Sequence, residues 1–274
     1  MSRSQLSIIL LLAAVVAVGG LVIGRARQRQ AAPPNAVLVF APCGMTGPLN
    51  VATAIFRKAH PEIRLEVVFD NANVLVRRVR KGERPDVFIS PGELEMRQLG
   101  EEGYIDTGTV RDFGSLDIVV FAPSKTKGLE TLADLAKPGI KYVSMGDPKF
   151  NSIGFYGEQA LRSLKLWGPL QSKLRLREYP LEAVKLVSQG QVDAGITYLT
   201  CPLETAPDKA SKSDLRVVAK FPRESYPPVR LQIGVLKGTS QRQPSQKFVD
   251  FLASEQARRA LAGTGLLPAP ERKP

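Results

Sequence analysis

The chain has 274 residues, of which 43% are hydrophobic and 23% are charged, and its formal net charge is +12. These values are ordinary for a globular protein of two domains or of one large domain. A surplus of positive charge suits nucleic acid or an anionic membrane, but the basic residues are scattered and form no aromatic-interleaved stripe. We therefore expect no nucleic-acid partner.

Residues 1–35 differ from the rest of the chain. An uncharged run of mainly Leu, Ile, Val and Ala, residues 4–24, predicts either a secretory signal or a single membrane anchor. We favour an uncleaved anchor, because no clean cleavage site precedes Arg25. The arginines after the run favour the cytoplasmic side, which conflicts with export of the downstream residues. Residues 31–35 then form a Pro-containing spacer.

From residue 37 onward, β-type and helical segments alternate, which predicts an α/β fold with mostly parallel sheets covered by helices. The first group of alternating strands and helices comprises 37–41, 48–60, 63–69, 74–80, 86–90 and 93–101. The remaining predicted elements are 116–122, 131–136, 141–145, 153–164, 174–178, 181–188, 193–198, 215–221, 231–236, 245–253 and 255–262.

Two groups of similar size predict two lobes joined by a hinge, with the chain crossing between them near 116–122 and 198–221. We assign 36–118 and 222–268 to lobe 1, 119–221 to lobe 2, and 269–274 to a flexible tail.

The first candidate binding element is the turn that follows the strand at 37–41. This turn contains Cys43, Gly44 and Met45, and it feeds a helix that starts near Pro48. A helix start supplies free backbone N–H groups and the positive end of a dipole, which together favour anions. Open α/β sheets place ligands at the carboxyl ends of their strands. We therefore predict that this turn forms one lip of a ligand cleft.

The chain resembles the periplasmic molybdate-binding proteins over residues 37–268. The resemblance rests on five blocks in the expected order: VLVFAPCGMTGPLNVATAIF, DVFISPGELEMRQLGEEGYID, LADLAKPGIKYVSMGDPKFNSIGFYGEQAL, GQVDAGITYLT and FVDFLASEQARRALAGTGLLP. It implies a type II periplasmic-binding-protein fold, with two α/β lobes, a hinge and a cleft between them. It also implies an ABC permease as partner and a location in the periplasm or on the outer face of the cytoplasmic membrane, with the N-terminal segment as membrane tether if it is uncleaved.

The same resemblance implies a site for a small tetrahedral oxyanion such as molybdate or tungstate. Family members hold it with serine hydroxyls, backbone N–H groups at helix starts and a tyrosine, and no cofactor is implied. Both serines are replaced here, although the amide of Asn71 and the backbone donors remain. The predicted ligand-binding residues are Cys43, Gly44, Met45, Asn71, Ala72, Ser152, Ile153 and Tyr198.

The two cysteines, Cys43 and Cys201, both fall near the predicted cleft and leave three interpretations open. They form a disulfide, which export permits; they are small unpaired buried residues; or they form a thiol or soft-metal site with Met45. The last interpretation gives an alternative function, a membrane-tethered sensor or a thiol or soft-metal binder on the same fold.

Enzymatic activity is not expected. The sequence has no nucleophile elbow, no Cys-His pair and no cluster with metal-ligand spacing. The single histidine, His60, precedes Pro61 at a predicted helix end, where a structural role fits better than general-base catalysis. We therefore predict no catalytic residue and no metal ligand.

Overall fold

A computed structural model describes residues 36–201 and 214–271. The segment predicted as signal or anchor, residues 1–35, lies outside these ranges, as do the last three residues of the predicted tail. Within the described ranges no helix combines the length and apolar character that crossing a membrane requires. The described part of the tail lies against Arg230, whose guanidinium donates hydrogen bonds to the carbonyls of Pro270 and Glu271.

The first lobe is built on a five-stranded sheet with the order β2-β1-β3-β10-β4. Strand β1 (Ala36–Pro42) lies between β2 (Arg64–Asp70) and β3 (Val87–Ser90), and all three are parallel. Strand β10 (Arg230–Val235) runs antiparallel to β3, and β4 (Arg111–Ser115) runs antiparallel to β10.

The second lobe is built on a sheet of the same design, with the order β7-β6-β8-β5-β9. Strands β7 (Leu174–Arg177), β6 (Val143–Gly146) and β8 (Ala194–Tyr198) are parallel, whereas β5 (Ile118–Pro123) and β9 (Leu215–Lys220) alternate in direction beside them. The prediction of mostly parallel sheets is therefore corrected. Each sheet is mixed, because the strands that lead into and out of the crossings pair antiparallel.

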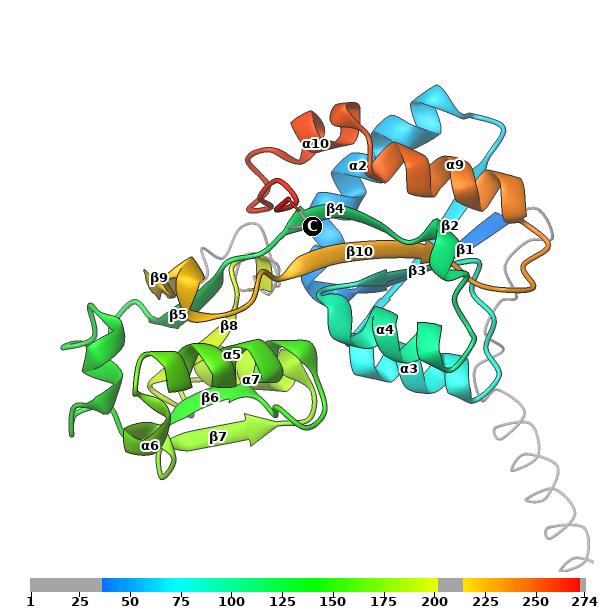
Figure 1. The fold of residues 1–274 in the computed structure, drawn as a ribbon. Helices are drawn as coiled ribbons and strands as arrows, with labels where there is room; N and C mark the ends of the chain where they lie inside the picture. The colour runs from blue at the N-terminus through cyan, green and yellow to red at the C-terminus, as the bar shows by residue number, and fades with distance from the viewer. Residues whose placement is uncertain (1–35, 202–213, 272–274) are drawn as a thin grey trace, which may run out of the picture. The chain divides into compact units, whose positions relative to one another are not determined.

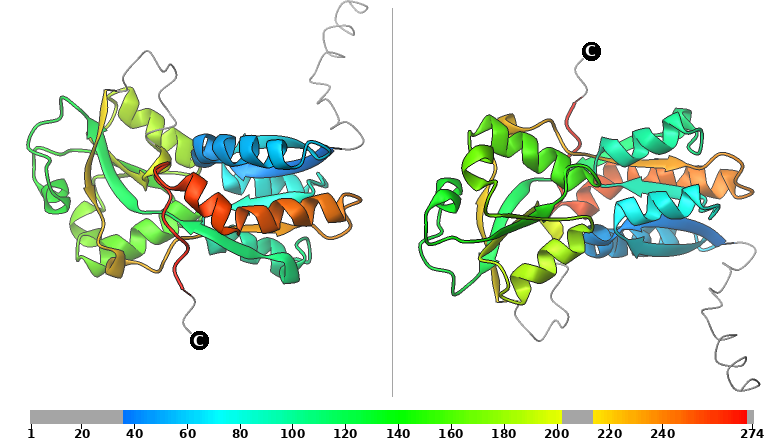
Figure 2. Two further views of the ribbon diagram at one scale, coloured as in Figure 1. Left: turned by 90° about the horizontal axis from the view of Figure 1, so that it is seen from above. Right: turned by 90° about the horizontal axis from the view of Figure 1, so that it is seen from below.

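Helices cover both faces of the first sheet (Figures 1 and 2). Alternate residues of β1 point to opposite faces, so Val37 and Val39 join the core under one helix layer and Phe40 joins the core under the other. The first layer comprises α2 (Thr46–Ala59), α9 (Arg242–Leu252) and α10 (Glu255–Leu261). The second comprises α3 (Ala72–Arg80) and α4 (Glu93–Glu101).

The second sheet is covered by α5 (Ser152–Ser163) and α7 (Pro180–Ser188), which pack on separate clusters of core residues. A short helix, α6 (Trp167–Leu170), follows α5 and was not predicted. The structure also contains the 3₁₀ segments η1 (Cys43–Met45), η2 (Thr107–Thr109), η3 (Leu132–Ala136) and η4 (Arg223–Ser225).

The chain passes from the first sheet to the second between β4 and β5, and it returns between β9 and β10 (Figure 1). Asp117 joins these two connections, because its buried carboxylate accepts hydrogen bonds from Lys220 and Arg223, each at 3.0 Å. The residues at which one lobe gives way to the other stay a prediction.

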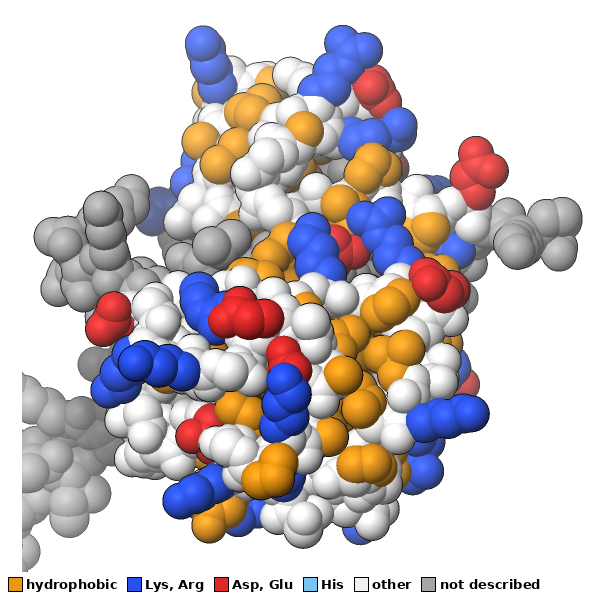
Figure 3. All heavy atoms as spheres, turned by 90° about the vertical axis from the view of Figure 1, so that its left-hand side faces the viewer, with side chains coloured by type: hydrophobic (Ala, Val, Ile, Leu, Met, Phe, Trp, Pro, Cys, Tyr) orange, Lys and Arg blue, Asp and Glu red, His pale blue; other side chains and the backbone are white. Residues whose placement is uncertain are grey.

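Basic side chains on the face shown in Figure 3 are dispersed among neutral and apolar ones and form no single band. This distribution agrees with the scatter of Lys and Arg along the sequence.

Candidate functional site

A small cavity lies between the two lobes, at the ends of the parallel strands. Its volume is about 40 Å³, and all eight predicted ligand-binding residues line it, as does Cys201. Their role as ligand contacts stays a prediction, but the structure brings them together from positions far apart in the sequence. The cavity is also lined by residues outside the set of eight: Pro42, Pro91, Glu95, Leu116, Asn151, Pro180, Thr197 and Thr200.

The first wall is the turn after β1, which forms η1 and leads directly into α2. Gly44 is required here by a close approach between the lobes. A Cβ atom added at Gly44 would lie 2.6 Å from Sγ of Cys201, which follows β8 of the second lobe. A side chain at position 44 would therefore require the side chain of Cys201 to shift.

The second wall is the start of α3, where Asn71 follows β2. The Asn71 amide oxygen accepts a hydrogen bond from the N–H of Leu181 at 3.1 Å, and Leu181 lies at the start of α7 in the second lobe. Asp70 does not line the cavity, and its carboxylate accepts the Asn71 N–H at 2.7 Å. The side chain of Asn71 thus accepts an N–H group at the start of α7, and its backbone N–H fixes the carboxylate of Asp70.

The third wall is the start of α5. Asn151 caps this helix, because its side-chain oxygen accepts the Gly154 N–H at 2.9 Å. A Cβ atom at Gly154 would lie 2.4 Å from the carbonyl carbon of Asp147, so glycine lets the helix start pack against the preceding turn. This packing places Ser152 and Ile153 on the wall of the cavity, and the Ser152 N–H is donated to the carboxylate of Glu95 at 3.1 Å.

The fourth wall comes from the end of β8 and contains two hydroxyl groups without partners. The Tyr198 hydroxyl and Oγ1 of Thr200 are buried, and neither makes a hydrogen bond within the described part of the chain. The side chain of Ser152 lies near the Tyr198 hydroxyl but outside hydrogen-bond geometry. Burial raises the pKa of Tyr198 well above its usual value. Both hydroxyls therefore remain neutral donors that a ligand in the cavity can use.

Glu95 is the one carboxyl group among the residues that line the cavity. Its side chain is buried, and it accepts the N–H of Ser152 at 3.1 Å across the gap between the lobes. Burial raises the pKa of this carboxyl above its ordinary value. The sequence does hint at this burial. Glu95 lies four positions before the buried Leu99, so both residues are on the apolar face of α4, although Glu95 belongs to none of the predicted ligand contacts.

Cys43 and Cys201 line the same cavity, and the structure records no bond between their sulfur atoms. Burial, with a further contribution from Cys201, raises the pKa of Cys43 to about 12. The Cys43 thiol is therefore a poor nucleophile at neutral pH. A disulfide between the two stays a prediction.

Direct contacts hold the lobes together at the rim of the cavity. Asn73 donates a hydrogen bond to the Glu178 carbonyl at 2.9 Å, and Arg77 forms an ion pair with the Glu178 carboxylate. Arg77 also donates to the Tyr179 hydroxyl at 3.1 Å. The side chains of Arg77 and Glu178 are each 38% exposed, so solvent screens their attraction.

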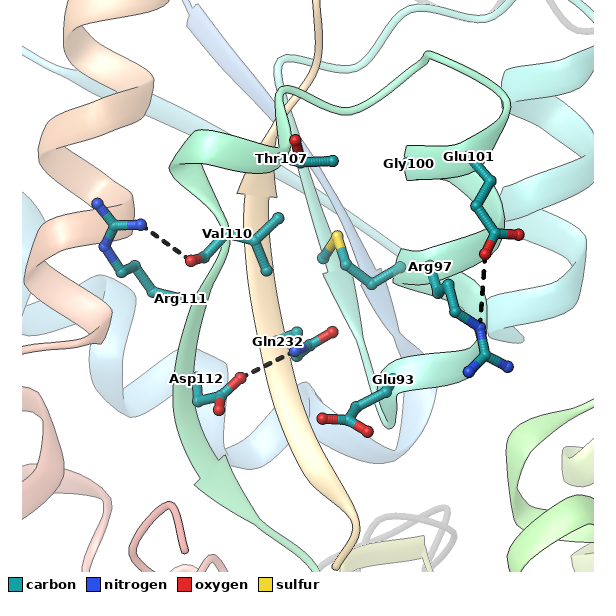
Figure 4. Close-up of a pocket in the computed structure, with 10 residues that line it drawn as sticks. Glu93, Arg97, Gly100, Glu101, Thr107, Val110, Arg111, Asp112 and Gln232 are labelled. Atoms are coloured by element: carbon teal, nitrogen blue, oxygen red, sulfur yellow. Dashed lines mark hydrogen bonds and ion pairs between the residues drawn. The ribbon is translucent and has the colours of Figure 1, made fainter. Parts of the chain in front are cut away.

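A second hollow, of about 540 Å³, lies on the first lobe between α4, η2 and β4 (Figure 4). Four of its lining side chains interact in two pairs. Arg97 approaches Glu101 at 4.0 Å, and Gln232 donates to Asp112 at 2.9 Å. We therefore take the cavity between the lobes as the candidate site.

Within residues 36–201 and 214–271, no group of three or more His, Cys, Asp or Glu side chains is placed to hold a metal ion. His60 follows α2, where its ring lies 4.8 Å from that of Phe56 and 3.4 Å from the carboxylate of Glu62. It does not line the cavity.

Comparison with known proteins gives concordant matches. The family model of bacterial extracellular solute-binding proteins matches residues 37–267. The molybdate-binding protein ModA of Haemophilus influenzae is 29% identical over 235 residues, which cover 84% of this chain and 89% of that protein.

Two solved structures show the same fold. The periplasmic molybdate-binding protein of Azotobacter vinelandii has a TM-score of 0.70 at 18% identity, covering 86% of this chain and 100% of that one. The sulfate-binding protein SubI of Mycobacterium tuberculosis has a TM-score of 0.69 at 16% identity, covering 85% and 87%. The fold is thus shared by proteins named for different ligands. The chain belongs to the bacterial extracellular solute-binding proteins, and it is a solute-binding protein of ABC transporters with the type II fold, not an enzyme.

Proposed function

We propose that this protein binds a small oxyanion of the molybdate or tungstate kind in the cavity between its lobes and delivers it to an ABC permease. The observation that supports this most directly is the pair of buried, unpartnered hydroxyls of Tyr198 and Thr200 beside the start of α5. Buried polar groups normally have partners, so these two donors indicate a ligand that accepts hydrogen bonds. The relative from Haemophilus influenzae is named for molybdate.

The size and charge of the cavity favour a small anion held by neutral groups. A volume of about 40 Å³ has room for a few water-sized groups, and therefore for a small inorganic ion rather than a sugar phosphate. No Lys, Arg or His is among the residues that line it. Helix-start N–H groups and hydroxyls can bind an anion without a fixed positive charge, because their dipoles point toward it.

Binding in this scheme requires no covalent chemistry. The first lobe supplies the turn at η1, and the second lobe supplies the α5 start and Tyr198, so a ligand between them favours the closed arrangement. A permease that recognises the closed arrangement then accepts only loaded protein. We place the protein in the periplasm or on the outer face of the cytoplasmic membrane, tethered by residues 1–35 if they are uncleaved.

The test is isothermal titration calorimetry with molybdate, tungstate, sulfate and phosphate. We expect binding of at least one oxyanion, and Tyr198→Phe should weaken it by about 10- to 150-fold, the value of one hydrogen bond to a charged group. Because the Tyr198 hydroxyl has no partner in the described structure, this substitution should not lower the melting temperature of the free protein.

Tyr226→Phe is the matched control. The Tyr226 hydroxyl accepts the Ile118 N–H at 3.2 Å and does not line the cavity. The Tyr226→Phe variant should therefore lose about 1 kcal/mol of unfolding free energy and bind the oxyanion with wild-type affinity. Absence of heat with all four anions would overturn the proposal, as would equal losses of affinity in both variants.

A second candidate function, a thiol or soft-metal binder or a membrane-tethered sensor, is supported by the position of Cys43 and Cys201 in one cavity. Two thiolates and the thioether of Met45 suit Cu(I). Thiol counting before and after reduction, together with titration of Cu(I) under reducing conditions, distinguishes this candidate. Stoichiometric Cu(I) binding that Cys43→Ser abolishes would support it, and two inert thiols with no Cu(I) binding would refute it.

A further inference from the structure

Glu95 occupies a position where a protein that binds anions is not expected to place a carboxylate. Its Oε1 accepts the N–H of Ser152, the first residue of α5, and both residues line the cavity. A negative charge here would lie beside a bound anion in a buried site with no basic side chain among its lining residues. Like charges at such short range repel strongly when water is excluded.

Burial raises the pKa of the Glu95 carboxyl and outweighs the hydrogen bonds from Ser152 and Ser90, which favour its ionised form, and the contacts of Ser90 leave room for a proton on Oε2. The Ser90 hydroxyl lies 2.5 Å from the carbonyl oxygen of Gly92 and 3.2 Å from Oε2 of Glu95. A hydroxyl has one proton, and the Gly92 carbonyl can only accept it. We assign the Ser90 proton to the shorter contact, with the Gly92 carbonyl. The contact between Ser90 and Oε2 of Glu95 is then a hydrogen bond only if Oε2 has a proton and donates it to the Ser90 oxygen.

The groups that face Glu95 do not supply a compensating positive charge. Tyr156 of α5 and Tyr198 of β8 are the titratable groups that interact with it from the second lobe. Burial raises the pKa of Tyr156 to about 12 and that of Tyr198 well above its usual value, so both stay neutral near neutral pH. The thiols of Cys43 and Cys201 line the same cavity.

The same holds for the other charges on α4. Arg97 is exposed and approaches the carboxylate of Glu101, while Glu93 is paired with Arg230 at 3.5 Å. None of these side chains lines the cavity.

We propose that Glu95 takes up a proton when the lobes close, so that the oxyanion is bound together with one proton. This inference rests on the proposed function. When the lobes separate, the contact with Ser152 is lost and Glu95 meets water, where a glutamate is ionised at neutral pH. On closure the carboxyl is buried beside the anion, and protonation removes the repulsion between them. Glu95 thereby makes the affinity for an oxyanion fall as the pH rises.

The test is calorimetric titration of the wild-type protein with molybdate, at several pH values and in two buffers with different enthalpies of ionisation. Above the pKa of a solvent-exposed glutamate, about 4.3, the affinity should fall as the pH rises, with a limiting slope of about tenfold per pH unit. At a fixed pH, the difference in heat between the two buffers should correspond to uptake of about one proton for each molybdate bound.

Glu95→Gln is the decisive variant, because a neutral amide can accept the Ser152 N–H and donate to Ser90. It should bind molybdate with an affinity independent of pH and with no buffer-dependent heat. Glu101→Gln, an exposed position on the same helix, should retain the wild-type proton uptake. Circular dichroism checks the fold of each variant. If Glu95→Gln does not fold, the wild-type titration alone decides.

Binding of molybdate without proton uptake in the wild type would overturn the role of Glu95 and leave the proposed function intact. Proton uptake that persists in a folded Glu95→Gln variant would also overturn it. Absence of binding heat in every buffer would instead overturn the proposed function, and the role of Glu95 with it.

Discussion

Substitution of Gly44 by alanine should hinder closure of the lobes without altering either lobe alone. The added methyl group would lie 2.6 Å from Sγ of Cys201 and 3.7 Å from Oγ1 of Thr200, both in the second lobe. Overpacking of this kind costs about 1–3 kcal/mol. If the penalty applies to the closed form only, the affinity for an oxyanion falls by about 5- to 150-fold.

The assay is a double-mutant cycle of Gly44→Ala and Cys201→Ala, measured as molybdate affinity by calorimetry. Cys201→Ala removes the sulfur atom, so the double variant should recover part of the loss, with a coupling of about 0.5–3 kcal/mol. Gly168→Ala is the control, since a Cβ atom there has no neighbour within 4 Å. Unchanged affinity in Gly44→Ala, or losses that simply add in the double variant, would refute the close approach of the two lobes at this point.

Three further predictions concern the framework of the site. Gly154→Ala should destabilise the protein by about 3 kcal/mol or more in urea unfolding, because the new methyl group would meet the backbone of Asp147, which cannot rotate away; a loss below about 1 kcal/mol would contradict this packing. Burial opposes ionisation of Asp117, but hydrogen bonds from Lys220 and Arg223 outweigh it and lower its pKa. The ionised carboxylate of Asp117 therefore stabilises the folded protein above the unfolded-state pKa of about 3.9, and this stabilisation is lost as the pH falls through the lower folded-state pKa. The unfolding free energy of Asp117→Asn should lack this dependence on acid pH. Burial raises the pKa of Cys43 to about 12, so mass spectrometry should find its alkylation slower than that of an exposed thiol by on the order of a thousandfold, and rapid alkylation in the folded protein would contradict this environment.

The walls of the cavity could be predicted from the sequence because they follow strands. Residues after β1, β2, β6 and β8 lie at the carboxyl ends of parallel strands, and such ends meet at one edge of a sheet. The turn at Cys43, the start of α3 at Asn71 and the start of α5 at Ser152 therefore converge as the motif order implies.

The elements that the sequence did not indicate are those whose stability comes from neighbours. Strand β4, RDFGS, has little apolar alternation, and it forms because β10 supplies its hydrogen bonds. The antiparallel direction of β10 beside β3 likewise depends on the chain's return from the second lobe, which local periodicity does not encode.

Two features of the site depend on how the lobes meet. The contact between Glu95 and Ser152 joins residues 57 positions apart, and that between Asn71 and Leu181 joins residues 110 positions apart. No motif records either contact, because each needs two lobes in one arrangement. The unpartnered hydroxyl of Thr200 was missed for a similar reason, since only its burial distinguishes it from any other threonine.

The central claim, an oxyanion site at Tyr198 and the start of α5, is tested most directly by a crystal structure with tungstate or molybdate. Anomalous scattering locates the metal atom of the oxyanion without ambiguity. We predict one strong peak in the cavity between the lobes, beside the start of α5, with an oxyanion oxygen within hydrogen-bond distance of the Tyr198 hydroxyl. A fully occupied peak elsewhere on the protein, or an empty cavity at saturating anion, would contradict this claim.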